Sequence, residues 1–342
     1  MIRIQNIYYM LAYAFQVLKE QGYASVATEE FENTADLLST ILARGLAIQI
    51  KRGLQREYNE ETEILSGIRG KIDVTDSVKR QTLIKQQLVC NHDEFSVDSY
   101  MNRIIKTTVE LLLHHDISIS RKKELRTLMF YFKDVKTLDP FHIDWNVQYS
   151  KNNQTYRMLI TVCYLVIKGL LQTTSDGQLK LMAFLDEQRM CRLYEKFVLE
   201  YFRKEHPQIK AAPSQIDWAL DDGIGTLLPA MQSDITLTYE GRTLIIDTKY
   251  YAHNTQTQYT AHTIHSANLY QIFTYVKNKA AQGGVVSGML LYAKTDEELQ
   301  PDQQFSMSGN TICVRTLDLD CHFALVAKQL DDIAFALVRG EL

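Results

Sequence analysis

The order of secondary structure in the second half of the chain is the strongest constraint on its fold. Hydrophobic periodicity predicts, in order, a helix over about 186–206, strands near 214–219, 233–239 and 242–251, a helix over 264–279, strands over 285–293 and near 311–315, and a closing helix. Strands and helices in this order pack as one sheet with helices on its faces. We therefore expect a mixed α/β domain with a central mixed sheet flanked by helices.

The first half has a different pattern and predicts a separate α+β domain. Its first 50 residues, 101–115 and 155–171 have helical periodicity, whereas glycines interrupt short strand-like segments over about 51–75 and indicate a β-hairpin region. The polar stretch 172–178 is the best linker candidate. The predicted domains are therefore 1–178 and 179–342.

Charge and cysteine content restrict the function classes. The net charge is −4, which argues against a protein that coats nucleic acid unaided, because phosphate binding needs a basic face. The 5 cysteines include no CxxC pair, as is usual for reduced, intracellular proteins. We find neither a secretory signal nor a membrane-spanning run, and we expect a cytoplasmic protein with no membrane partner.

An acid and a base stand at the end of an apolar predicted strand. Asp247 and Lys249 end the run that begins at Thr243, and residues two apart on a strand project to the same side. Antiparallel pairing would bring Asp234 beside Asp247. Two carboxylates near a lysine make a suitable Mg²⁺ site for phosphodiester hydrolysis. Asp-x-Lys alone is more often a surface ion pair, so further features are needed.

Three such features accompany the pair. Asp234 lies at hairpin distance, the upstream helix carries Glu195 in LYEKFV, and the downstream helix carries Gln271 and Tyr275 four residues apart, on one face. This set resembles the PD-(D/E)xK nuclease superfamily, and the Gln-x-x-x-Tyr helix resembles its RecB-like branch. The resemblance implies Asp234, Asp247 and Lys249 as catalytic residues. It also implies Asp234, Asp247 and Glu195 as Mg²⁺ ligands, with Mn²⁺ as a substitute, and Gln271 and Tyr275 as flanking residues.

Two features depart from the superfamily pattern. Ser233 precedes Asp234 where the superfamily name has proline, a position that varies. The helix acid is ambiguous, because Glu200 lies five residues after Glu195. The LYEKFV pattern favours Glu195 as the ligand, and Glu200 has the alternative of a solvated helix face.

The wider sequence resembles the McrC family of nuclease subunits. The segments that carry the likeness are 6–11 (NIYYML), 67–72 (GIRGKI), 102–106 (NRIIK), 233–235 (SDI) and 246–251 (IDTKYY). The resemblance implies DNA cleavage within a GTP-dependent restriction complex that acts on modified double-stranded DNA of the 5-methylcytosine type. It also implies an oligomeric McrB-like AAA+ GTPase partner, whose GTP turnover the N-terminal domain would stimulate.

The chain carries no G-x-x-x-x-G-K-[ST] phosphate loop, so GTP is expected only on the partner. The expected partner contact is the basic region around Lys51, Arg52, Arg69 and Lys71; solvated charges on an exposed hairpin are the equal alternative. Two other functions stay open: a non-catalytic activator of the AAA+ GTPase, and a stand-alone RecB-like nuclease.

Overall fold

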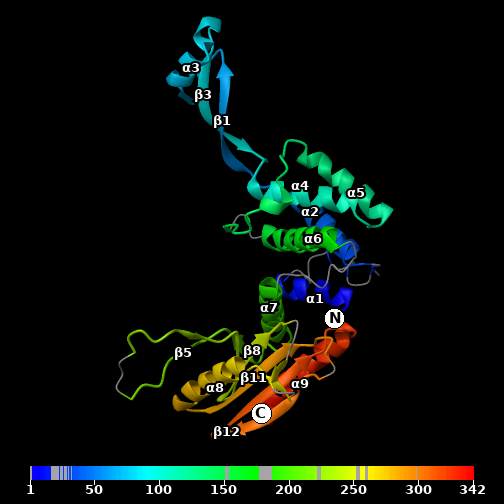
Figure 1. The fold of residues 1–342 in the computed structure, drawn as a ribbon, viewed down its shortest axis with the longest axis vertical. Helices are drawn as coiled ribbons and strands as arrows, with labels where there is room; N and C mark the ends of the chain where they lie inside the picture. Colours follow the sequence, from blue (N-terminus) through cyan, green and yellow to red (C-terminus); the bar gives the residue numbers. More distant parts are fainter. Residues whose placement is uncertain are drawn as a thin grey trace. The chain divides into compact units, whose positions relative to one another are not determined.

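The structure, a computed structural model, divides into two compact units (Figure 1). It describes residues 2–16, 23, 26, 29, 31, 33–150, 153, 155–176, 187–221, 225–251, 255–258, 261–297 and 299–342. One unit, the split unit, combines 1–37 with 180–342, and the other, the central unit, comprises 38–179. The 1–37 segment, expected in the N-terminal domain, thus lies with the C-terminal part of the chain.

A six-stranded mixed sheet forms the middle of the split unit, in the order β12-β13-β11-β8-β7-β4. The strands are β4 (Lys210–Ala212), β7 (Ile235–Tyr239), β8 (Arg242–Lys249), β11 (Val285–Ala293), β12 (Gln303–Met307) and β13 (Asn310–Leu317). β11 is parallel to both β8 and β13, whereas the pairs β7–β8, β4–β7 and β12–β13 are antiparallel. This confirms the mixed α/β prediction. Two short pairs, β5 (Gln215–Ile216) with β6 (Met231–Gln232) and β9 (Thr255–Gln258) with β10 (Ala261–Ile264), are the other described strands of this unit.

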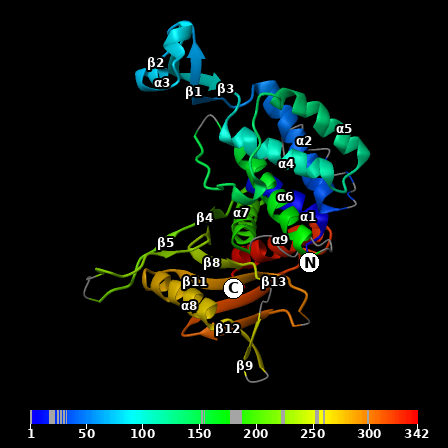
Figure 2. The same cartoon turned by 45° about the horizontal axis from the view of Figure 1, so that its top comes forward.

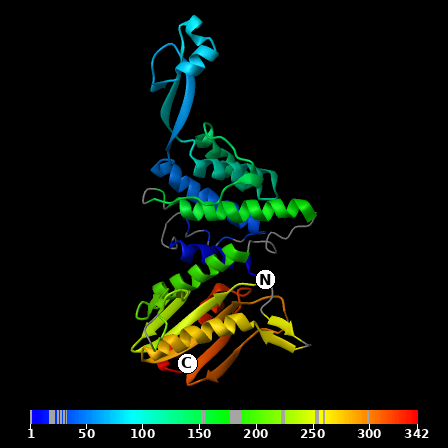
Figure 3. The ribbon, with the colours of Figure 1, turned by 60° about the vertical axis from the view of Figure 1, so that its left-hand side comes forward.

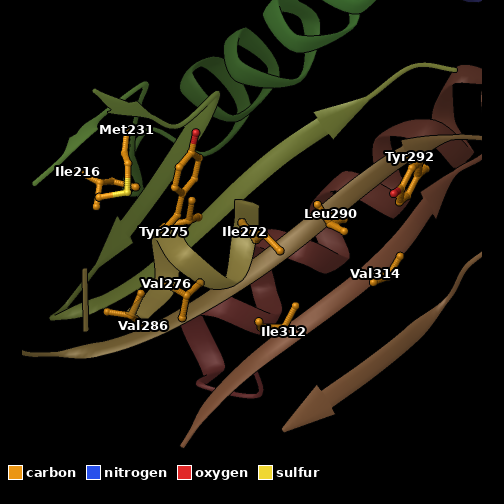
Figure 4. Packing of buried hydrophobic residues seen from close by; sticks show 11 residues of the cluster. Ile216, Met231, Ile272, Tyr275, Val276, Val286, Leu290, Tyr292, Ile312 and Val314 are labelled. Carbon is orange, nitrogen blue, oxygen red and sulfur yellow. The ribbon is translucent and has the colours of Figure 1, made fainter. Parts of the chain in front are cut away.

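Helices cover both faces of this sheet (Figure 2). α8 (Ser266–Ala281) packs on β8 and β11, and α9 (Phe323–Arg339) packs on the opposite face, with α7 (Glu187–Glu205) against β8, β4 and α9. Under α8, a buried cluster joins Ile245 of β8, Leu290 of β11 and Val314 of β13 to Ile272 and Val276 (Figure 4). The core therefore lies between α8 and the central strands.

The N-terminal helix α1 (Ile4–Ala14) belongs to the split unit because its apolar and aromatic residues pack against α7 and α9. The ring of Tyr9 stacks on Phe323, with ring centroids 3.9 Å apart. The Asn6 side-chain amide donates to the carbonyls of Leu319 and Cys321, each at 2.8 Å. Buried aromatic area outweighs proximity along the chain, which explains why the predicted domain limits did not place this helix here.

The central unit combines helices with a small antiparallel sheet. Its helices are α2 (Thr34–Arg52), which begins just before the division, α3 (Val74–Lys79), α4 (Tyr100–His114), α5 (Ile119–Met129) and α6 (Tyr156–Asp176). Its sheet has the order β1-β3-β2, from β1 (Glu57–Leu65), β2 (Lys71–Ile72) and β3 (Leu88–Ser96). In Figure 3 this sheet stands apart from α4, α5 and α6.

Two boundaries here differ from the sequence prediction. The full-length partner of β1 is β3, so the expected hairpin over 51–75 is a longer one into which β2 and α3 are inserted. The expected linker 172–178 is helical through Asp176, since α6 continues over its Thr-Thr-Ser residues, and 177–178 lie outside the described residues. Helix propensity is a weak prior, and packing of an apolar helix extends it across poor formers. Within the described part of the chain, no helix is long and apolar enough to cross a membrane.

Candidate active site

The acid and base of the Asp-x-Lys tripeptide lie at the end of β8, a strand in the middle of the sheet. In β8 the side chains of 243–248 are buried, and Asp247 itself is 1% exposed. The Lys249 Nζ lies 2.6 Å from Asp247 Oδ2. The four residues before Asp247, 243–246, are buried in the core, so the carboxylate lies where the core ends. A buried carboxylate needs such a partner, because burial of an isolated charge is unfavourable.

Asp234 reaches the same place from the neighbouring strand. Ile235 pairs with Ile246 in the antiparallel β7–β8 ladder, so Asp234 is next to Asp247 in register. The Asp234 Oδ2 accepts hydrogen bonds from the backbone N–H of Thr248 at 2.7 Å and from its hydroxyl at 2.9 Å. These bonds orient the carboxylate. The role of Thr248 was not predicted; the signal available was its hydroxyl between the two charged residues.

The structure distinguishes the two candidate glutamates of α7. Glu195 is half-buried, and the charges of Asp234 and Asp247 act on its carboxyl group. Glu200 is buried elsewhere: its carboxylate pairs with Arg203 at 2.7 Å and accepts from the Gln16 side chain at 2.9 Å. Glu195 is therefore the glutamate that faces the aspartates, and Glu200 holds α1 against α7. Arg192, one turn before Glu195, partly offsets the negative charge there.

The two flanking residues of α8 form a chain of hydrogen bonds to the lysine. Lys249 Nζ donates to Gln271 Oε1 at 3.3 Å, and Gln271 Nε2 donates to the Tyr275 hydroxyl at 3.0 Å. The i, i+4 spacing places both side chains on the helix face that covers β8. The chain fixes the position of the Lys249 ammonium.

Burial and the neighbouring charges together shift three pKa values at this site. Burial, with the nearby Asp234 and Asp247 carboxylates, raises the pKa of Glu195 to about 7. Burial raises the pKa of Asp247 to about 6, against the opposing effect of Lys249. Burial alone would lower the pKa of Lys249, but the Asp247 carboxylate more than offsets it and the pKa is raised. The ammonium thus stays charged at neutral pH.

Such a site fits a divalent cation that takes oxygen ligands. Three carboxylates share one region with one lysine, and a cation there would relieve the carboxylate repulsion that adds to burial in raising the two acid pKa values. In the described part of the chain no group of three or more His, Cys, Asp or Glu side chains is arranged so that it could hold a metal ion. Mg²⁺ does not require one, because it keeps several waters and binds through one or two carboxylates.

The four basic residues expected to contact a partner lie on separate elements of the central unit. Lys51 and Arg52 are exposed in the last turn of α2. Arg69 precedes β2 and lies 3.9 Å from Glu63, and Lys71 is exposed at the start of β2. Lys51 and Arg52 thus lie on a different element from Arg69 and Lys71.

Comparison with known proteins assigns the chain to a family. Residues 4–293 match the family described as McrBC 5-methylcytosine restriction system component. The chain belongs to this family. It is 30% identical over 340 residues, 97% of each chain, to an Escherichia coli (strain K12) protein described as Type IV methyl-directed restriction enzyme EcoKMcrBC. The family resemblance predicted from the sequence is thus confirmed.

A solved structure of the family supports the fold. The chain is similar, with a TM-score of 0.50 and 17% identity, to a chain of an assembly of Thermococcus gammatolerans McrB AAA+ hexamers with bound McrC. The similarity covers 96% of this chain and 76% of that one. It extends over both units, so the α/β architecture is that of a McrBC component.

Proposed function

We propose that this chain is the Mg²⁺-dependent endonuclease subunit of a GTP-driven restriction complex that cuts DNA carrying modified cytosine. The observation that carries the proposal is the convergence of Asp234, Asp247 and Lys249 at the ends of two neighbouring strands, with Glu195 facing them. Membership of the McrBC family supplies the reaction class and the modification type. We expect Mn²⁺ to support cleavage in place of Mg²⁺.

The side chains have distinct roles in this mechanism. Asp234, Asp247 and Glu195 would hold the cation. When bound, Mg²⁺ stabilises charge on the scissile phosphate and lowers the pKa of a coordinated water. Lys249 keeps its proton because Asp247 raises its pKa, so it acts as a fixed donor to a phosphate oxygen or to the attacking water. Gln271 and Tyr275 maintain the direction of that ammonium.

The same proposal includes an oligomeric AAA+ GTPase partner, and with it a cytoplasmic location. The related Thermococcus assembly joins McrC to McrB hexamers. The part of the central unit from β1 to β3 supports a docking role, because its strands, α3 and the segments between them carry exposed apolar side chains, and such side chains gathered in one region are typical of interaction surfaces. They are Tyr58, Ile64, Ile68, Val74, Val78, Leu83, Ile84 and Phe95. Arg69 and Lys71 lie between β1 and β3, in the same part of the central unit, and would contact the partner with them.

The test is cleavage of a methylated and an unmethylated plasmid by the full chain with the AAA+ protein encoded beside it, GTP and Mg²⁺. We expect cutting of modified DNA only, and loss of at least about 100-fold in rate with Lys249→Ala or Asp247→Asn. Asp302→Asn, an exposed aspartate paired with Arg315, is the matched control and should cut normally.

GTP turnover measured in the same reactions separates the alternatives. Site variants that leave turnover stimulated confirm a nuclease role beside an activating one. If Asp247→Asn restricts phage as wild type does, the chain is an activator whose acidic site is vestigial. Metal-dependent cutting by the chain without its partner would instead favour a stand-alone nuclease.

A further inference from the structure

A cavity lies beside the acidic site on the same face of the sheet, and its lining has the opposite charge. Its volume is about 180 Å³. The residues that line it are Lys210, Ala212, Ser214, Gln215, Ile216, Thr236, Thr238, Ile245 and Lys279. Two are lysines, four more carry side-chain hydroxyl or amide groups, and none of these described residues is acidic. In a chain with a net charge of −4, such a lining is unusual and favours an anion.

Strand register places the cavity and the carboxylates on one face. Side chains two apart on a strand share a face, so Ile245 and Thr236 lie on the side of Asp247 and Asp234. Thr236 pairs with Ile245 and with Ala212, and Thr238 pairs with Lys210. The edge strand β4 therefore brings Lys210 to this face.

Helix α8 connects the two sites. Gln271, near its beginning, contacts Lys249 of the acidic site, and Lys279 in its last turn lines the cavity. Eight residues of helix span about 12 Å, and two to four strand residues span roughly 7–13 Å. Along the helix axis, each strand of DNA rises about 3.4 Å per nucleotide, so this separation, laid along the axis, spans roughly two to four nucleotides.

We propose that this cavity binds a backbone phosphate of the substrate DNA, roughly two to four nucleotides from the phosphate that is cut. The inference rests on the proposed nuclease function and adds the substrate contact that the acidic site lacks. Lys210 and Lys279 supply the charge, although the Lys279 Nζ also donates to Gln282 Oε1 at 2.9 Å, and Ser214 and Thr238 add hydroxyl groups to the lining. A phosphate held here would align the neighbouring phosphates of that strand toward the acidic site.

The test measures DNA binding separately from cleavage. The full chain, in complex with its AAA+ partner, is titrated against a labelled methylated duplex in EDTA at several salt concentrations. For Lys210→Ala/Lys279→Ala we expect a Kd about 3- to 10-fold weaker and a salt dependence lower by about one counterion. Lys279→Arg, which keeps the charge, should bind as wild type does.

Lys277→Ala is the matched control. Lys277 lies on the same helix but donates to the Ser308 carbonyl at 2.9 Å, away from the cavity. Stimulated GTP turnover reports folding of each variant, and the exposed Lys210→Ala alone serves if the double variant does not fold. An unchanged Kd and salt dependence in the cavity variants overturns the proposal, as does an equal loss in Lys277→Ala.

Two further outcomes are distinguishable. If inorganic phosphate raises the Tm of wild type but not of the double variant, while both bind DNA equally, the cavity is a free-anion site and the proposal is wrong. If wild type binds DNA through the cavity lysines but never cuts with Mg²⁺, the nuclease function fails and the phosphate contact stands.

Discussion

Glu195 and Glu200 lie five residues apart on α7 but have different partners, and this difference predicts different consequences of substitution. We expect Glu195→Gln to lower the cleavage rate about 10- to 100-fold, because a cation ligand is weakened. Glu200→Gln should keep the cleavage chemistry and lower the free energy of unfolding by about 1 kcal/mol, because the Arg203 pair and the Gln16 hydrogen bond are weakened. Cleavage rates and urea unfolding of both variants check this prediction.

The opposite pattern would reassign the ligand. If Glu200→Gln abolished cutting in a stably folded protein while Glu195→Gln cut normally, the helix acid of the site would be Glu200. Adding Mg²⁺ at increasing concentration distinguishes a lost ligand from a lost fold, because only the former is rescued in part by excess metal.

The raised acid pKa values predict how stability depends on pH. Folded Glu195 and Asp247 have pKa values of about 7 and about 6, whereas unfolded carboxyls titrate near 4. Between these values the folded chain holds protons that the unfolded chain has lost, so the free energy of unfolding falls as pH rises. In EDTA we expect wild type to lose more stability from pH 5 to pH 8 than Glu195→Gln, measured by urea midpoints.

Divalent cation should reduce that loss. Mg²⁺ binds the ionised carboxylates, so it stabilises the folded chain more at the higher pH, where protons no longer compete. If the stability of wild type and of Glu195→Gln depended on pH identically, with and without Mg²⁺, the conclusion that carboxylates crowd together at this site would be contradicted.

At the scale of elements, α8 approaches β11 so closely that residue 288 has no room for a side chain. A Cβ at Gly288 would lie 2.7 Å from Val276 Cγ2 and 2.9 Å from Ile272 Cγ1. We expect Gly288→Ala to lower the free energy of unfolding by about 1–3 kcal/mol through overpacking. The double variant Gly288→Ala/Val276→Ala, which makes room, should recover part of the loss. Thermal unfolding checks both, and equal Tm values for wild type and Gly288→Ala would contradict it.

The sequence predicted elements best where one strong pattern determines them. The apolar run 285–293 matches β11 at both ends, and the acid and base at the end of β8 lie together because residues two apart on a strand share a face. Edge strands were missed: β4 is three residues long, and β12 has little apolar alternation. Their pairing depends on neighbours far along the chain, which periodicity does not report.

For the same reason, the sequence could not predict the side-chain contacts between elements. The sequence shows two glutamates on α7, and their surroundings decide which one faces the aspartates. Arg203 and Gln16, which bind Glu200, come from the same helix and from a residue 184 positions away. Only the three-dimensional arrangement brings Gln16 to that carboxylate, so the choice between Glu195 and Glu200 rests on the structure.

At the scale of the whole molecule, the N-terminal helix α1 is far along the chain from α7 and α9, against which it packs. Tyr13 of α1 contacts the rings of Phe197 and Tyr201 on α7, and its hydroxyl donates to Glu205 at 2.8 Å. The intervening residues 38–179 form a unit of their own. The candidate nuclease unit therefore needs both ends of the chain.

This arrangement predicts that a change in α1 weakens the split unit selectively. Asn6 is 1% exposed and its amide satisfies two backbone carbonyls near the start of α9. In Asn6→Leu these carbonyls lose their donor, and we expect about 1–3 kcal/mol less stability. Hydrogen exchange should show lower protection in α9 and β13 and unchanged protection in α4 and α6. Equal loss in all four elements would mean that the chain unfolds as one cooperative body and that the division at residues 37 and 180 has no energetic counterpart.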